Sequence, residues 1–143
     1  NYKLMRNESG HIEQFNDWYE ETSPGVLRLK PSFDRGVTAG GRYFEHLSAF
    51  LGKRDVALDD ELKSRVIAAQ YTLNELGPAW QNEVSNSHFS MPENILLMYS
   101  TESPWGLLAD KDLVMTDYSV VRSTLQVNNP ERKPNWTGLY YDI

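Results

Sequence analysis

The sequence of 143 residues contains no cysteine, and this absence excludes two kinds of site. Without thiols the chain forms neither the disulfides that stabilise many small secreted domains nor thiolate metal centres. Such a chain suits a reducing compartment, so we expect a cytoplasmic location. A domain of this length also buries enough surface to fold without cross-links.

Long hydrophobic runs are absent as well. No stretch approaches the roughly 20 apolar residues that a membrane helix requires, and the N-terminus lacks the charged and then apolar pattern of a secretory leader. We therefore expect no membrane partner. The chain begins with Asn1 rather than methionine, which suggests that residues 1–143 are a single domain taken from a longer protein.

Positive charge is scarce, because 14 Lys and Arg face 20 Asp and Glu, for a formal net charge of −6. Proteins that bind nucleic acids neutralise phosphates with Lys and Arg, so we expect no nucleic-acid partner. An acidic surface instead favours fast association with basic proteins. The charge therefore points to a basic protein as partner.

The usual spacings of catalytic and metal-binding residues are also missing. None of the three histidines, His11, His46 and His88, has a second ligand at helical spacing, and no serine lies in a Gly-x-Ser-x-Gly turn. The glycine-containing segment 31–41 lacks the lysine and hydroxyl of a phosphate-binding loop. We expect no metal and no cofactor, and these patterns identify no catalytic residue.

What the sequence does contain is a strong helical pattern over residues 58–80. Asp59 and the acidic residues after it supply an N-cap and a negative first turn, while Gly77 and Pro78 predict the end of the helix. Apolar residues recur at steps of three and four, which predicts one face directed at a core. That face consists of Leu62, Val66, Ala69, Leu73, Leu76 and Trp80.

Two further helices are predicted before this one. Residues 9–19 carry apolar side chains on one side and should pack on the long helix. Residues 42–51 have a similar pattern, and we expect them to form an antiparallel helical hairpin with residues 58–80. The aromatic residues predicted to face the core are Phe15, Trp18, Phe44, Phe50 and Trp80.

Strands are predicted mainly in the second half of the chain. Residues 26–30 and 120–127 alternate between apolar and polar, and the apolar run 95–99 is typical of a strand covered on both faces. We therefore predict an α+β fold, with N-terminal helices on a small, mostly antiparallel sheet, and a mainly α fold as the alternative. Irregular structure is expected over 31–41 and 85–93, and a last short strand within 136–143.

Several aromatic residues fall in or beside predicted loops. Large rings at such places either close the edge of a core or contact a partner. The candidates for partner binding are Trp105, Trp136, Tyr140 and Tyr141.

One constellation points to an enzyme. Arg28 lies on an early strand, and Ser100, Thr101 and Glu102 end a later buried strand. This order resembles the arginine and the Ser-Thr-Ser strand of ADP-ribosyltransferase toxins. The resemblance implies NAD as cofactor, with Arg28 on the pyrophosphate and the strand hydroxyls on the nicotinamide ribose. That family also carries a Glu-x-Glu or Gln-x-Glu loop, whereas the one late glutamate here is Glu131.

Three functions are therefore open. The first is a non-enzymatic, acidic interaction module of the immunity or inhibitor type, which binds a basic protein such as a toxin. The second is a toxin or effector enzyme domain with ADP-ribosyltransferase-like chemistry on NAD. The third is a structural or assembly component of a viral or multi-protein particle.

Overall fold

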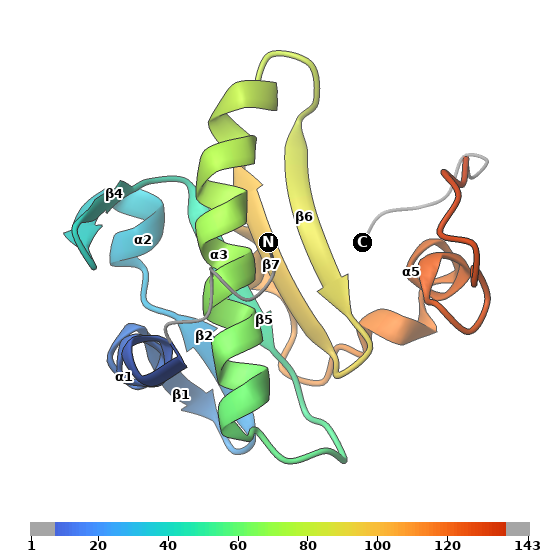
Figure 1. Ribbon diagram of the computed structural model, residues 1–143, viewed down its shortest axis with the longest axis horizontal. Coiled ribbons are helices and arrows are strands. Elements are labelled where there is room, and N and C mark those ends of the chain that lie inside the picture. The colour runs from blue at the N-terminus through green and yellow to red at the C-terminus, as the bar shows by residue number, and fades with distance from the viewer. Residues whose placement is uncertain (1–7, 137–143) are drawn as a thin grey trace.

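A five-stranded sheet with helices on both faces dominates the computed structural model, which describes residues 8–136 (Figure 1). Every strand pair is antiparallel. The sheet and its helices confirm the predicted α+β class. Across the sheet the strands are β1 (Tyr19–Ser23), β2 (Val26–Leu29), β5 (Leu47–Leu51), β7 (Ile95–Ser100) and β6 (Asn86–Met91), and a separate ribbon pairs β3 (Val37–Ala39) with β4 (Arg42–Phe44).

The helices divide between the two faces of the sheet. On one face α1 (Glu8–Trp18) packs on the long helix α3 (Asp60–Trp80), as predicted, and the His11 ring lies 2.9 Å from the Ser64 hydroxyl between them. The opposite face carries α4 (Trp105–Leu108) and the segment that follows it. The remaining short elements are α2 (Ser32–Arg35), the 3-10 helix η2 (Met115–Asp117) and α5 (Ser119–Thr124).

Each face of the sheet has its own core. The larger core lies beneath α1 and α3 and includes the buried aromatic residues Phe15, Trp18 and Phe44. The smaller core lies on the α4 face and is formed by Val26, Phe50, Leu96 and Met98, with Ala109, Leu113 and Met115 packed against it. Strands β5 and β7 are buried along their whole length because both cores cover them.

The start of the long helix is confirmed and its predicted end is wrong. The Asp59 carboxylate accepts a hydrogen bond of 2.8 Å from the Leu62 N–H group, as an N-cap residue does. Gly77 and Pro78 lie inside α3 rather than after it, and Trp80 is 52% exposed instead of facing the core. Gly77 serves a close contact with β7, not a helix terminus.

The helical hairpin predicted for residues 42–51 is also wrong, because this segment forms strands β4 and β5. All five residues of β5 are buried, between β2 on one side and β7 on the other. A short, continuously apolar run fits a helix face and a doubly covered strand equally well. Strand pairing with residues distant in the sequence therefore decides the structure.

Three other segments differ from their predictions. Residues 119–124 form α5 rather than a strand, and the hydroxyl groups of Ser123 and Thr124 bond to carbonyl oxygens three positions back in that helix. The polar segment 85–93 contains strand β6, because pairing with β7 satisfies its backbone. Segment 31–41 contains α2 and β3. The helix at 9–19 and the strands at 26–30 and 95–99 are confirmed.

Within residues 8–136, no helix is both long and apolar enough to cross a membrane. The last strand expected within 136–143 falls almost entirely outside the described residues, and so do Tyr140 and Tyr141.

Candidate functional site

Arg28 fastens α4 to the sheet. Burial lowers the pKa of its guanidinium group from the ordinary value, and the negative charge of Asp110 acts in the opposite direction. The group also lies 5.0 Å from the ring centre of Phe50. It donates hydrogen bonds to three carbonyl oxygens at the end of α4, those of Gly106 (2.9 Å), Leu107 (3.2 Å) and Ala109 (2.7 Å). The last carbonyl groups of a helix have no hydrogen-bond donor within the helix, and Arg28 supplies the donors here.

Gly106 allows α4 to lie directly on β5. A Cβ atom at this position would come within 2.4 Å of the Ala49 backbone nitrogen, so only glycine fits here without displacing the strand. The Gly106 N–H group donates a hydrogen bond of 3.0 Å to the Ser48 hydroxyl. Two side chains of the sheet therefore bond to this short helix, Ser48 to one N–H group and Arg28 to the carbonyl groups at its end.

Ser100 shapes the turn that leads into α4. Its buried hydroxyl accepts hydrogen bonds from the N–H groups of Glu102 (3.3 Å) and Ser103 (3.2 Å). This turn leaves Glu102 exposed and presents Trp105 with 43% of its surface accessible. Trp105 therefore lies on a helix that Arg28 and Ser48 bond to the sheet.

A polar cleft of about 320 Å³ lies at the end of β7, and its lining reaches Pro104, the residue before Trp105. Three segments form it: α2, the connection between β4 and β5, and the turn after β7. Its charged groups are three carboxylates and one guanidinium, so its charge is negative. The lining residues are Asp34, Arg35, Glu45, His46, Ser100, Thr101, Glu102, Ser103 and Pro104.

His46 joins these three segments through its backbone. Its N–H group donates to the carbonyl oxygen of Asp34, and its own carbonyl accepts from the Ser100 N–H group, both at 3.0 Å. Its φ of +60° is uncommon for a residue with a side chain, and such conformations concentrate at functional sites. The imidazole lies edge-on to the Tyr99 ring, and its Nε2 atom is 3.8 Å from the Glu45 carboxylate.

The hydroxyl of Tyr99 is less acidic than usual. Burial raises its pKa above the ordinary value, and the negative charge of Glu45 adds to the effect. The neutral hydroxyl donates a hydrogen bond of 2.9 Å to Gln81 at the end of α3. Tyr99, which packs against His46, is thereby tied to the end of the long helix.

An apolar pocket of about 410 Å³ lies on the α4 face of the sheet, and Trp105 borders it. Its walls come from β6, β7 and the part of the chain that runs from α4 to α5, both helices included. The apolar lining residues are Leu96, Met98, Trp105, Leu108, Ala109, Leu113, Met115, Tyr118, Val120 and Val121, and the polar ones are Asn86, His88 and Asp110.

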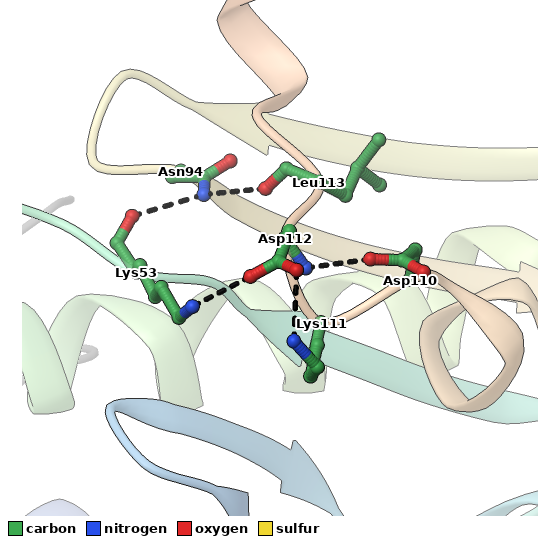
Figure 2. A network of polar contacts seen from close by, with 6 residues as sticks. All are labelled: Lys53, Asn94, Asp110, Lys111, Asp112 and Leu113. Carbon is green, nitrogen blue, oxygen red and sulfur yellow. Dashed lines mark hydrogen bonds and ion pairs between the residues drawn. The ribbon is translucent and has the colours of Figure 1, made fainter.

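Asn94 fixes the segment that forms one wall of this pocket (Figure 2). Its side-chain amide donates to the carbonyl oxygens of Lys53 (3.0 Å) and Leu113 (2.9 Å), and its side-chain oxygen accepts from the Met115 N–H group (2.8 Å). The residue is buried, with a φ of +61°. Three parts of the chain that are distant in sequence therefore meet at one side chain.

Asp112 ties the same segment to Lys53 at the surface (Figure 2). Its carboxylate accepts hydrogen bonds from the ammonium groups of Lys111 (2.8 Å) and Lys53 (2.5 Å). These two bonds lower the pKa of Asp112 to about 2, and the bond from Lys111 has the larger effect.

The structure separates the residues that the sequence suggested for partner binding. Trp105 lines the apolar pocket and directly follows Pro104, which lines the cleft, whereas Trp136 follows α5 and is 94% exposed. Tyr140 and Tyr141 lie outside the described residues. Trp105 lines the apolar pocket, and Trp136 lines neither the pocket nor the cleft.

The residues of the ADP-ribosyltransferase resemblance also lie in different places. Ser100 and Thr101 line the polar cleft. Arg28 bonds to α4, and Glu131 forms an ion pair with Lys133 beyond α5; neither is among the described residues that line the cleft. An NAD site built from these residues stays a prediction.

Sequence reasoning missed His46 and Asp110 as site residues. The neighbouring Glu45 was a signal for His46 in the sequence. Residues 42–51 were expected to form a helix, however, and adjacent side chains on a helix point in different directions. The positive φ of His46 has no signature in the sequence. Across residues 8–136, no group of three or more His, Asp or Glu side chains is arranged to hold a metal ion.

Comparison with known proteins adds no relative. No family model, no curated protein and no solved structure matches this chain.

Proposed function

We propose that this chain is a protein-binding module that recognises a basic protein through the surface around Trp105. This Trp105 surface consists of the exposed indole ring of Trp105 and the carboxylates of Asp34, Glu45 and Glu102. The observation that carries the proposal is an exposed tryptophan on a helix bonded to the sheet, one residue after the lining of a cleft with three carboxylates and one arginine.

The chemistry of this surface suits Lys and Arg side chains. Tryptophan is enriched among the residues that dominate binding energy at interfaces, and its ring attracts cations. Carboxylates form charge-assisted hydrogen bonds with guanidinium and ammonium groups. Arg35 neutralises part of the charge, which leaves the cleft negative.

The net charge of the whole chain adds a long-range contribution. A formal charge of −6 attracts a basic protein before contact and raises the association rate at low salt. A rigid acidic surface of this kind is what an immunity or inhibitor protein needs to cover the basic surface of a toxin. We therefore favour that type of interaction module over a catalytic one.

The test compares two double variants with the same change in charge. Glu45→Lys with Glu102→Lys alters the Trp105 surface, at the ends of inner strands, and Glu20→Lys with Glu21→Lys alters exposed positions on the edge strand β1. A basic protein captured from the source organism is purified, and its affinity for each variant is measured by calorimetry. We expect the first pair to weaken binding at least about tenfold, which is about 1.4 kcal/mol, and the second pair to have much less effect.

Trp105→Ala should also weaken binding by about tenfold or more. Equal losses for the two charge variants would mean that net charge, and not this surface, drives the association. If no captured protein is basic, or if Trp105→Ala binds like the natural chain, the proposal is wrong.

A further inference from the structure

The two edges of the sheet are built differently. Strand β1 carries the exposed carboxylates Glu20 and Glu21, and its pairing with β2 shifts register before Ser23. Strand β6 has neither charge nor proline, and it pairs with β7 in unbroken register from Asn86 to Met91. Charges and bulges on an edge strand hinder pairing with another chain, so β1 is protected and β6 is not.

The unprotected edge is open in the part of the chain that the structure describes. Strand β6 is last in the order β1-β2-β5-β7-β6, and no strand within residues 8–136 pairs with its outer side (Figure 1). An edge of this kind has main-chain groups that can pair with an extended peptide. Six residues are enough to pair with a peptide along its length.

The apolar pocket lies beside this edge on the α4 face. Asn86 and His88 of β6 line it together with Leu96 and Met98 of β7. Because side chains alternate along a strand, every second residue of an added strand would point to the same face as Asn86 and His88. One of these side chains would lie at the pocket.

The lining of the pocket favours an aromatic side chain. Met98 and Met115 contribute thioether groups, which adapt to irregular shapes and make favourable contacts with aromatic rings. The volume of about 410 Å³ gives room for a large ring. Strand-addition sites gain affinity from main-chain hydrogen bonds and specificity from such pockets.

Two observations favour a segment of the basic partner as the peptide that pairs with β6: the carboxylates near this edge, and the position of Trp105 at the pocket. Asp110 lines the pocket, and the exposed Glu83 lies just before β6, so carboxylates flank the edge at two places. Trp105 borders the pocket and also belongs to the Trp105 surface. A basic protein bound at that surface has a continuous path to β6.

We propose that β6 binds an extended segment of the basic partner by strand addition, with an aromatic side chain of that segment in the apolar pocket. This inference rests on the proposed function and names its mode of recognition. The segment would carry Lys or Arg beside the aromatic residue, facing Asp110 or Glu83.

The test uses a synthetic peptide of the sequence Lys-Thr-Val-Thr-Trp-Thr-Val-Thr-Lys. Three control peptides accompany it: one with alanine in place of the tryptophan, and two with N-methyl groups on alternate amides, one for each edge of the peptide. Binding is followed by amide chemical shifts and hydrogen exchange of the full chain. We expect shifts and protection at residues 86–91, and affinity at least about tenfold weaker for the alanine peptide and for one of the two N-methylated peptides.

Two variants test the pocket itself. Ala109→Phe fills it and should weaken peptide binding about tenfold, whereas Val127→Phe at an exposed position should leave it unchanged. Equal affinity of all four peptides, or shifts confined to other strands, overturns strand addition. So does self-association of the chain through β6 in sedimentation, because the occupant would then be a second copy.

The two proposals fail in different ways. If the basic partner loses affinity for the Glu45→Lys, Glu102→Lys variant but leaves hydrogen exchange at residues 86–91 unchanged, strand addition is wrong and the proposed function stands. If the peptide protects β6 while the partner is insensitive to that variant, the Trp105 surface is wrong.

Discussion

Gly77 lies in the last turn of α3, against the ring of Tyr99. A Cβ atom at Gly77 would come within 2.2 Å of the Tyr99 Cγ atom, and Tyr99 is buried. The absence of a side chain therefore lets α3 approach β7 at the point where the chain enters the turn to α4. The same ring packs against the imidazole of His46, which lines the polar cleft, so this contact links α3 to the cleft.

We predict that Gly77→Ala destabilises the protein although alanine favours helices by about 1 kcal/mol over glycine. The extra methyl group must displace the Tyr99 ring, and overpacking of this kind costs about 1–3 kcal/mol. The free energy of unfolding from urea titration gives the measurement. The double variant with Tyr99→Leu should lose less than the sum of the two single variants, because the smaller side chain leaves room. Simple additivity would show that the contact does not limit the packing.

Arg28 gives a second prediction, because its planar guanidinium reaches three carbonyl oxygens at once. Arg28→Lys keeps the charge but removes the planar group with several N–H donors, and we expect a loss of about 2 kcal/mol in the free energy of unfolding. Arg122→Lys is the matched control, since that exposed arginine also bonds to two carbonyl oxygens. It should change stability by less than about 0.5 kcal/mol. Equal effects would mean that α4 does not depend on Arg28.

The same variant separates the binding module from the ADP-ribosyltransferase alternative. NAD that binds the folded chain raises its melting temperature by mass action. We expect no rise at millimolar NAD, because the Arg28 guanidinium is committed to α4. A rise that Arg28→Lys abolishes would instead support a nicotinamide site at Arg28, Ser100 and Thr101.

Asn94 gives a third prediction, which concerns the wall of the apolar pocket. Asn94→Asp keeps an acceptor for the Met115 N–H group but turns a carboxylate oxygen toward the carbonyl oxygens of Lys53 and Leu113. We expect a loss of about 2–3 kcal/mol at neutral pH, because two buried hydrogen bonds are replaced by repulsion. Hydrogen exchange over residues 109–115 should rise with it.

Two controls define the origin of that loss. Asn94→Gly suits the positive φ but removes all three side-chain hydrogen bonds, so it should also destabilise. Asn128→Asp removes an exposed hydrogen bond to Arg122 and should cost less than about 0.5 kcal/mol. If Asn94→Gly is as stable as the natural chain, the backbone conformation and not the hydrogen bonds explains the residue.

Local signals in the sequence were enough where the structure is decided locally. Helix α3 shows both its acidic cap at Asp59 and its apolar face, and strand β7 is a short apolar run between turns. Strand β5 is as apolar as β7, yet a pattern that also fits a helix made it appear helical. Its pairing with β2 and β7 depends on residues about 20 and 50 positions away, which no local pattern contains.

The candidate site also combines features that local sequence predicts with features that depend on tertiary structure. Trp105 could be predicted, because a large aromatic residue between Pro104 and Gly106 suggests an exposed loop ring. The role of Arg28 could not, since its partners are carbonyl oxygens some 80 residues later. The hydrogen bonds of Asn94 and the positive φ of His46 likewise arise from tertiary structure.

A fourth prediction concerns Asp112 and the stability of the protein at acid pH. Its pKa of about 2 lies below the ordinary value, so the folded state holds the ionised form. In the unfolded chain the pKa of an aspartate is about 4. The ionised Asp112 therefore makes its full contribution to stability above that pH, and the contribution is lost as the pH falls toward about 2. Asp112→Asn should therefore flatten the fall in stability between about pH 4 and about pH 2. NMR titration of the carboxyl carbon measures the pKa directly, and an ordinary value would rule out the ion pairs with Lys111 and Lys53.

The alkaline range gives the last prediction, which depends on Tyr19 and Gln70. The Tyr19 hydroxyl is buried and donates a hydrogen bond of 2.8 Å to the side-chain oxygen of Gln70. Burial raises its pKa far above the ordinary value of about 10, because the phenolate has no water around it. The neutral form is thus favoured by folding. Its contribution is complete below about pH 10 and is lost as the pH rises further.

Tyr19→Phe should have opposite effects in the two pH ranges. At neutral pH it leaves the oxygen of Gln70 without its donor, at a cost of about 1–3 kcal/mol. Above about pH 10 the natural chain loses stability as the unfolded tyrosine ionises, and the variant loses less. Tyr99 contributes in the same direction, so the slope is reduced rather than abolished. Urea unfolding from about pH 8 to about pH 11 measures both effects, and parallel curves for the two chains would show that Tyr19 ionises as freely in the folded state as in the unfolded one.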